Sequence, residues 1–263
     1  MRFIDCHLHT NLIDDGVTER LAMSGMEAVV IPMLHCLSGL FDASGALRLW
    51  DRFLDFEIKR GTTIGYEAFV SLSVPMYGLT SEGIDECLEK LPRYLKHERV
   101  VAMGEIGLDV GSENEERLFR AQLQLAKAHN LPVIVHTPIR LAPQAPEVIR
   151  KVVSIIEEEK FDITRVVLDH AGESTFDYRT TTGAMIGLSV CHDKMPTEVA
   201  ANYVLNNPDK LDRLLINTEV ASGDGYFTVP RVILAMRRLG IKRDQIEQVV
   251  WENPKRFFKL PID

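Results

Sequence analysis

Short apolar runs alternate with longer amphipathic stretches along the whole chain, and this alternation constrains the possible fold more than any other feature. Apolar, β-branched runs separated by helical patterns are typical of parallel strands covered by helices. We expect strands at 2–6, 27–32, 63–72, 99–105, 131–136, 164–169, 183–190 and 212–218. A chain of 263 residues with about eight strand–helix units has the size of one (β/α)8 barrel. The sequence therefore predicts an α/β protein, a TIM barrel in a single domain that spans 1–263.

Helical patterns fill the intervals between these runs. We expect helices at 45–60, 80–97, 113–130, 227–239, 243–250 and 254–259. The helix at 113–130 opens with acidic residues, which suit the positive end of a helix dipole. Two further segments, at 136–146 and 217–227, are rich in proline or glycine and predict long loops after strands. In a barrel, loops at the carboxyl ends of the strands build the active site.

Charge and cysteine content narrow the choice of partner and compartment. The formal net charge of -8 repels polyanions, so a nucleic-acid partner is not favoured. Four cysteines, Cys6, Cys36, Cys87 and Cys191, show no paired spacing, which indicates reduced thiols rather than a disulfide framework. No apolar run approaches the length of a membrane span, and the first residues lack the pattern of a secretory signal. We therefore expect a cytoplasmic protein with no membrane partner.

Four histidines and one glutamate stand at the ends of predicted strands. His7 and His9 follow the first strand, and Glu105, His136 and His170 end three later ones. Taken singly, each has an ordinary explanation as a hydrogen-bonded packing residue or a turn cap. Imidazole and carboxylate are ligands of divalent metals such as zinc, and one barrel rim collects residues from distant strands. Together, the five residues predict a metal site and a metal-dependent hydrolase.

Several segments of the chain resemble the TatD family of metal-dependent hydrolases. The resemblance is carried by DCHLH (5–9), GEIGLD (104–109), FRAQLQLAKAHNLPVIVH (119–136) and ENPKRFF (252–258). It is strongest toward an uncharacterised branch of predicted metal-dependent hydrolases with HTP after the fifth strand. The resemblance implies an amidohydrolase-like TIM barrel that uses divalent metal ions.

The same resemblance implies a binuclear site with two ions per chain, either Zn²⁺, Mn²⁺ or Mg²⁺. His7 and His9 would hold one ion, His136 and His170 would hold the other, and Glu105 would bridge them. These roles follow from the family pattern.

The acid that normally completes such a site departs from the family pattern. TatD proteins carry ETD at the end of the eighth strand, where this chain reads NTE at 217–219. Glu219 then takes the place of the aspartate, as a metal ligand and as the proton acceptor. Asp224 in the following GDG segment is a competing candidate. We favour Glu219 because it stands at the strand end, where barrel catalysts concentrate.

Two further departures concern the substrate. TatD nucleases carry an H-x-R-D-like segment after the fifth strand and an HCFSG-like segment after the sixth. This chain has HTPIR (136–140) and HAGES (170–174) at those places. The groups that would meet a DNA backbone are therefore not preserved, and DNA hydrolysis is not implied.

Other polar residues are candidates for the rim of the site. His35 and His192 are possible extra ligands or substrate contacts, and Lys194 is placed to meet an anionic group. Asp109 is a candidate for a residue that orients a metal ligand without binding the metal itself. The alternative for the first three is an ordinary polar loop.

The favoured reaction is hydrolysis of a phosphoester by water activated at two ions, with Glu219 accepting the proton. We expect a small-molecule or short phosphoester substrate. Amides or lactones are the alternative, supported by the acidic charge and the altered nuclease segments. A lyase or isomerase on the same metal, or a barrel without catalysis, are the remaining alternatives.

Overall fold

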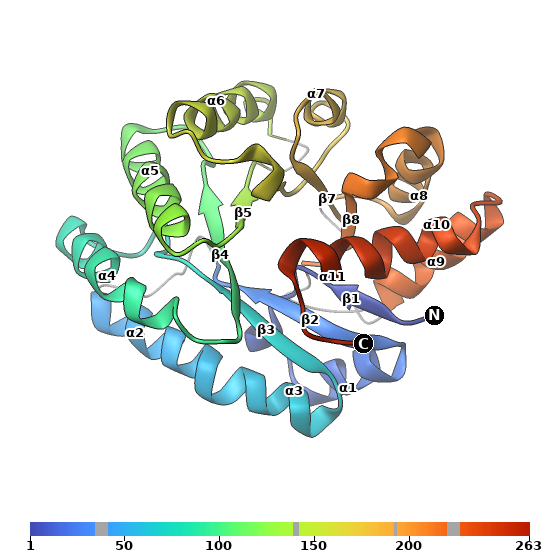
Figure 1. The fold of residues 1–263 in the computed structure, drawn as a ribbon, viewed down its shortest axis with the longest axis horizontal. Coiled ribbons are helices and arrows are strands. Elements are labelled where there is room, and N and C mark those ends of the chain that lie inside the picture. The colour runs from blue at the N-terminus through green and yellow to red at the C-terminus, as the bar shows by residue number, and fades with distance from the viewer. Residues whose placement is uncertain (35–41, 139–141, 192–193, 220–226) are drawn as a thin grey trace.

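Eight parallel strands form one sheet in the part of the chain described by the computed structural model, which covers 1–34, 42–138, 142–191, 194–219 and 227–263. Their order in the sheet follows the chain from β1 to β8 (Figure 1). The strands are β1 (Phe3–Asp5), β2 (Met26–Pro32), β3 (Glu67–Leu72), β4 (Val100–Gly107), β5 (Val133–His136), β6 (Val166–Leu168), β7 (Met185–Ser189) and β8 (Leu214–Asn217). Because all neighbours are parallel, the carboxyl ends of the strands meet at one end of the barrel.

The seam between β8 and β1 is closed largely by a side chain. The carboxylate of Asp5 accepts hydrogen bonds from the backbone N–H of Thr218 at 3.3 Å and from its hydroxyl at 2.6 Å. The N–H of Glu219 then donates to the carbonyl of His7 at 2.7 Å. These contacts bring the end of the last strand against the end of the first.

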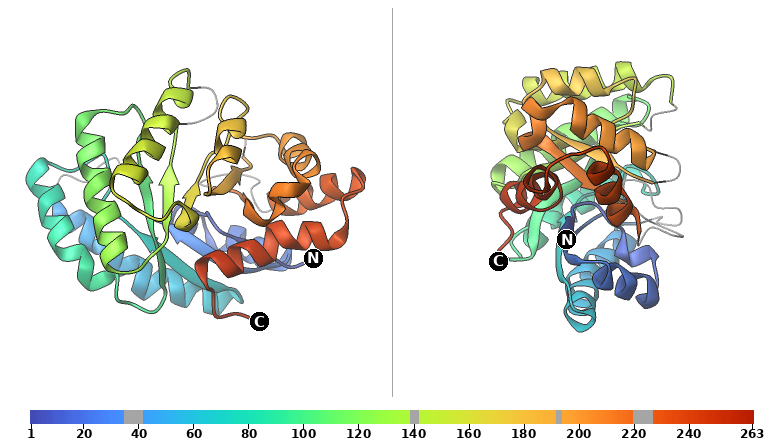
Figure 2. Two further views of the ribbon diagram at one scale, coloured as in Figure 1. Left: turned by 45° about the horizontal axis from the view of Figure 1, so that its top comes forward. Right: turned by 90° about the vertical axis from the view of Figure 1, so that its right-hand side faces the viewer.

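Helices form an outer layer around the strands (Figures 1 and 2). They are α1 (Asp15–Met23), α2 (Ala43–Arg52), α3 (Ile58–Ile64), α4 (Ser81–Tyr94), α5 (Glu113–Ala128), α6 (Ala145–Glu158), α7 (Phe176–Thr181), α8 (Thr197–Asn206), α9 (Thr228–Arg238), α10 (Arg243–Glu247) and α11 (Asn253–Phe258). Side-chain caps fix several of their first turns. Ser112 and Glu115 form a capping box at the start of α5, which satisfies backbone N–H groups that lack a helical partner.

The predicted barrel is confirmed, and the differences lie at element boundaries. The run expected as a strand at 63–72 begins as a strand only at Glu67, because α3 continues to Ile64 and ends at Gly65. Gly65 has a φ of 109°, a left-handed conformation that suits glycine and terminates the helix. The helix expected at 45–60 is the longer continuous segment from α2 through a π-helical turn at 53–57 to α3. The loop expected at 136–146 ends where α6 begins, at Ala145.

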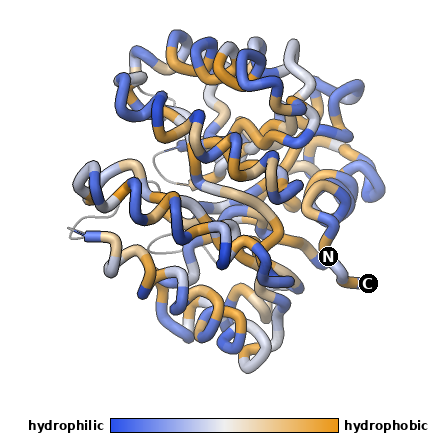
Figure 3. The backbone as a smooth tube through the Cα atoms, turned by 60° about the vertical axis from the view of Figure 1, so that its left-hand side comes forward, coloured by the Kyte–Doolittle hydropathy of each residue, from blue (hydrophilic) through white to orange (hydrophobic). Residues whose placement is uncertain are grey.

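The core lies between the strands and the helices. Helices alternate between hydrophilic and hydrophobic colours along their turns, as expected for elements with one buried face (Figure 3). The π-helical turn at 248–252 contacts both β1 and β8, and α11 follows it. The two ends of the chain lie close together (Figure 2), and Arg2 donates to the backbone carbonyl of Asp263 at 2.8 Å. In the described residues, no helix is both long and apolar enough to cross a membrane.

Candidate metal centre

The five predicted ligands gather at the carboxyl ends of the strands. His7 and His9 follow β1, Glu105 lies near the end of β4, His136 ends β5, and His170 follows β6. Each of the five is at most 3% exposed. Parallel pairing from β1 to β6 aligns these strand ends, so residues up to 163 positions apart reach one place.

The first group of ligands consists of His7, His9 and Glu105. The Nε2 atoms of the two imidazoles are 3.2 Å apart. The Nε2 of His7 lies 3.4 Å from Oε1 of Glu105, and the Nε2 of His9 lies 3.9 Å from Oε2. The three ligand atoms lie within 4.8 Å of one another, as one cation requires.

The second group consists of Glu105, His136 and His170. The Nε2 of His170 is 3.1 Å from Oε1 of Glu105 and 3.1 Å from Nδ1 of His136. The same Nδ1 is 3.5 Å from Oε1 of Glu105. Glu105 therefore belongs to both groups, which is the arrangement expected of a bridging carboxylate.

Three of the four imidazoles use their outer nitrogen on a protein acceptor. The Nδ1 of His7 faces Asp169 at 2.5 Å, that of His9 faces the carbonyl of Pro32 at 3.2 Å, and that of His170 faces Ser189 at 2.9 Å. A proton on Nδ1 leaves Nε2 with a free lone pair directed at the other ligands. This donor set and its orientation fit divalent metal ions.

In the metal-free cluster, burial and neighbouring charges shift the pKa values of His7 and His9 in opposite directions. Burial alone lowers the pKa of His7, but the negative charges of Glu105 and Asp169 outweigh it and raise that pKa to about 9. Burial and the positive charge of His7 lower the pKa of His9 to about 3. Neighbouring ligands with such different proton affinities are typical of functional sites.

Lys194 and Glu219 lie directly beside the second group. Lys194, which follows β7, forms an ion pair with Oε2 of Glu219, which follows β8. The same oxygen is 3.2 Å from Nδ1 of His170, and the Lys194 Nζ is 3.3 Å from both nitrogens of that ring. Burial raises the pKa of Glu219, which makes its carboxylate a stronger base than a solvated one.

The remaining candidates differ in how far the structure describes them. The side chain of Asp109 is 41% exposed, and its carboxylate is 3.7 Å from Nε2 of His136, close to a ligand as expected. His35, His192 and Asp224 lie outside the described residues. Of the two acids expected after the eighth strand, Glu219 is the one within the described residues, and it lies beside the cluster.

Three buried residues of the centre were not recognised in the sequence. Asp169 contacts His7, Ser189 contacts His170, and Arg179 donates to the backbone carbonyls of Asp169 and His170. Asp169 and Ser189 both lie at the end of an apolar strand run, and this position could have identified them as candidates from the sequence. Arg179 lies in a helix and carried no such signal.

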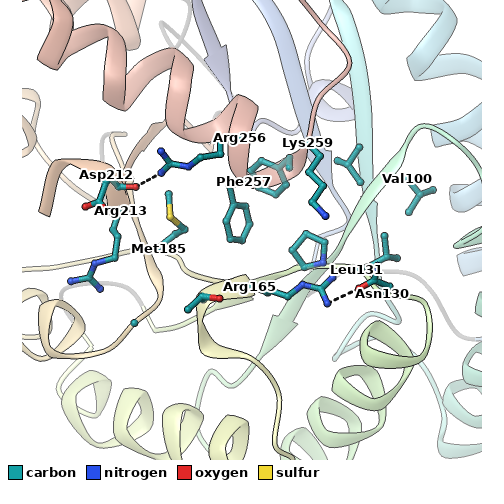
Figure 4. A pocket seen from close by; sticks show the side chains of 15 residues that line it. Val100, Asn130, Leu131, Arg165, Met185, Asp212, Arg213, Arg256, Phe257 and Lys259 are labelled. Atoms are coloured by element: carbon teal, nitrogen blue, oxygen red, sulfur yellow. Dashed lines mark hydrogen bonds between the residues drawn. The ribbon is translucent and has the colours of Figure 1, made fainter.

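A cavity of about 560 Å³ lies away from this cluster. It lies at the amino ends of β4 to β8, where α11 covers it (Figure 4). Phe257 and Met185 form part of its apolar lining, and Arg165, Arg256 and Lys259 supply positive charge. In barrel enzymes the chemistry is at the opposite, carboxyl end, where the ligands converge here.

Known proteins match this chain over nearly its whole length. Residues 4–259 match the family model described as TatD related DNase. An uncharacterized metal-dependent hydrolase of Methanocaldococcus jannaschii is 31% identical over 258 residues, covering 98% of this chain and 100% of that protein. An N-acetyltaurine hydrolase of Danio rerio is 28% identical over 189 residues, which covers 60% of this chain and 52% of that one. The crystal structure of a TatD-like protein from Archaeoglobus fulgidus has the same fold, with a TM-score of 0.78, 22% identity and coverage of 98% and 100%.

Proposed function

The chain belongs to the TatD related DNase family of metal-dependent hydrolases, and from this premise we propose that it hydrolyses a small phosphoester at a centre of two divalent ions. The observation that carries the proposal is the position of Glu105 in two groups of ligands. His7 and His9 would hold one ion, and His136 and His170 the other, with Glu105 shared. When bound, two such ions supply positive charge and lower the pKa of a water molecule to about 7.

Glu219 is the residue that we assign to proton transfer. Its side chain is 13% exposed and lies 3.2 Å from Nδ1 of His170, so it contacts a buried ligand and is also accessible to water. The raised pKa of this carboxylate favours acceptance of a proton from the attacking water. Lys194 holds the carboxylate in place through their ion pair.

Lys194 also bears on the choice of substrate. Lys194 is 8% exposed, and its ammonium lies 3.3 Å from Nε2 of His170. The negative charge of Glu219 outweighs the effect of burial and raises the pKa of this lysine, so the group stays cationic at neutral pH. A cation here stabilises an anionic substrate and the charge that develops on its oxygens. The family description and this cation both favour a phosphoester.

The net charge of -8 limits the size of that phosphoester. Long polyanions such as DNA are repelled by the summed field, whereas a single phosphate group meets the local positive charge of the centre. We therefore propose a small or short substrate, with zinc, manganese or magnesium as the ion and the cytoplasm as the compartment.

An amide is the second candidate substrate. It is supported by the N-acetyltaurine hydrolase among the relatives and by the HTPIR and HAGES segments, which depart from the nuclease pattern. The same ligands and the same proton acceptor serve attack on a carbonyl carbon. An amide that carries an anionic group would use Lys194 in the same way.

The test is a substrate screen of metal-free protein reconstituted with Zn²⁺, Mn²⁺ or Mg²⁺. Bis(4-nitrophenyl) phosphate, 4-nitrophenyl phosphate, an N-acetylated aminosulfonate and a lactone cover the candidate bonds. We expect turnover of a phosphoester only with metal, and incorporation of ¹⁸O from labelled water into the product. Full activity after exhaustive chelation would refute metal dependence, and product without label would indicate a lyase or isomerase. Cleavage of the amide alone would select the second candidate.

A further inference from the structure

Asp169 is a buried carboxylate that contacts ligands from both groups. It follows β6, and its side chain is 1% exposed. Its oxygens accept hydrogen bonds from the ring of His7, from the backbone N–H of His170 at 3.0 Å, from Ser189 at 2.9 Å and from Asn217 at 3.0 Å. The contacts therefore join β1, β6, β7 and β8 below the metal centre.

One carboxylate oxygen acts directly on the first group. Oδ2 of Asp169 lies 2.5 Å from Nδ1 of His7. A carboxylate can only accept at this position, so the ring proton is fixed on Nδ1. In the neutral form of the ring, which is the form that binds a metal ion, the opposite nitrogen, Nε2, then carries the lone pair, and it faces Glu105 at 3.4 Å.

The other oxygen acts on the second group through a serine. The hydroxyl of Ser189 donates its one proton to Oδ1 of Asp169 at 2.9 Å. The same hydroxyl oxygen is therefore an acceptor toward Nδ1 of His170, which lies 2.9 Å away. This relay, together with Oε2 of Glu219 at 3.2 Å from the same nitrogen, fixes the proton of His170 on Nδ1 and leaves Nε2 facing Glu105 at 3.1 Å.

The surrounding chain is built to hold Asp169 in this place. A Cβ atom at Gly187 would lie 2.0 Å from Oδ1 of Asp169, so only glycine leaves room for the carboxylate. Arg179 is fully buried and donates to the backbone carbonyls of Asp169 at 3.0 Å and His170 at 3.3 Å. It also donates to the hydroxyl of Thr137, the residue after the ligand that ends β5, at 2.7 Å.

We propose that Asp169 is a positioning residue that sets the ring tautomer of one ligand of each ion, so that both ion sites depend on a single carboxylate. The inference rests on the proposed two-ion centre and adds a residue that couples its halves. It follows the general pattern in which a carboxylate behind a histidine fixes that ligand for its metal.

The test is Zn²⁺ titration of metal-free protein by calorimetry, with Asp169→Asn as the main variant. An asparagine keeps the shape of the side chain and one acceptor oxygen, but it turns an N–H toward Nδ1 of His7. The proton of His7 is then displaced to Nε2, the nitrogen that must bind metal. We expect two tight binding steps in the parent protein and a weakening of both, by about 10–100-fold, in the variant.

Ser189→Ala breaks the relay and leaves the bond to His7, so it should weaken one binding step only. Asp5→Asn is the matched control, because Asp5 is equally buried but bonds to Thr218 and to backbone rather than to an imidazole. It should leave both affinities unchanged. NMR of zinc-loaded, ¹⁵N-histidine-labelled protein gives a second readout, since the parent should show protons on Nδ1 of both His7 and His170.

The outcomes separate this inference from the proposed function. A parent protein that binds no ion would refute the two-ion centre itself. Two tight steps in the parent, with unchanged affinities in folded Asp169→Asn, would refute only the role of Asp169. If that variant does not fold, Ser189→Ala decides. A weaker Zn²⁺ affinity in one binding step supports the relay, whereas unchanged affinities, or a weakening of both steps, would overturn it.

Discussion

At the carboxyl end of the barrel, buried acids and imidazoles face one another, whereas at the amino end two arginines donate to the protein's own backbone. Arg213, which lines the large cavity, donates to the carbonyls of Thr180, Thr182 and Ala184. Arg256 donates in the same way to the carbonyl of Asp212 at 2.6 Å (Figure 4). The amino-end cations thus join segments of chain, while the carboxyl-end groups are oriented toward a shared centre.

The comparison shows that cavity size alone does not locate chemistry in this barrel. The amino-end cavity has a volume of about 560 Å³, yet its arginines are held by neighbouring groups. At the other end, the outer nitrogens of the ligand imidazoles are held and the inner ones converge. Convergence of oriented ligands is therefore the better guide to function.

The largest effect should follow from Glu105→Gln. The change removes the carboxylate shared by both groups and puts an amide N–H among nitrogens that need to face a cation. We expect loss of both ions and a fall in activity of more than about 100-fold, since even residues behind the ligands cost 10–100-fold. Metal analysis after gel filtration and steady-state kinetics check this. Retention of two ions would contradict the assigned bridge.

Glu219→Gln should have the next largest effect, and it distinguishes the two acids named from the sequence. Loss of the proton acceptor should lower kcat by about 10²–10⁴-fold, typical of general acid–base catalysis. Asp224→Asn is the matched comparison and should leave kcat near the parent value. If the two results are exchanged, Asp224 is the acid of the eighth strand.

The seam beside the centre gives a pH dependence of stability. Burial raises the pKa of Asp5 from 3.8 to about 6 in the folded chain. The folded state therefore holds this proton more tightly than the unfolded state, so the contribution of Asp5 to stability is full below pH 3.8 and falls as pH rises to about 6. The loss corresponds to roughly 3 kcal/mol.

Denaturant unfolding of metal-free protein and of Asp5→Asn, at several pH values between 3.5 and 7, isolates this contribution. The difference between the two proteins should decrease across that interval and then remain constant. A difference that does not change with pH would show that Asp5 does not titrate at the seam.

The smallest effect concerns the amino end. Arg213→Ala removes three hydrogen bonds from a guanidinium to backbone carbonyls, each in a partly buried setting. We expect a loss of about 2 kcal/mol in the free energy of unfolding, with kcat and metal content unchanged. Thermal and denaturant unfolding measure the stability, steady-state kinetics measure kcat, and metal analysis measures the ion content. A change in kcat without loss of stability would contradict the structural role of this end.

Much of the architecture was predictable from local patterns. All eight strands were predicted, and the five ligands His7, His9, Glu105, His136 and His170 were expected at one rim because parallel strands end together. Boundaries were less predictable. The strand expected from 63 begins at Glu67, because packing of α3 against β3 extends the helix up to Gly65.

Asp169 and Arg179 show what local patterns did not reveal. Asp169 precedes a predicted ligand, but nothing in VVLDHA indicates that its side chain reaches the ring of His7, 162 positions earlier. Arg179 lies in a short helix. It is completely buried because the helix packs its side chain against residues at the strand ends, and this arrangement is a property of the tertiary structure. Both assignments depend on long-range contacts.

The sequence by itself determined the alternation of strands and helices, the family, and the residue types placed at the strand ends, because hydrophobic periodicity and ligand chemistry are local properties. The tertiary structure decided which nitrogen of each imidazole faces inward, which carboxylate is shared and which acid supports the ligands from behind. Those features depend on closure of the barrel, which brings residues from opposite ends of the chain within hydrogen-bonding distance.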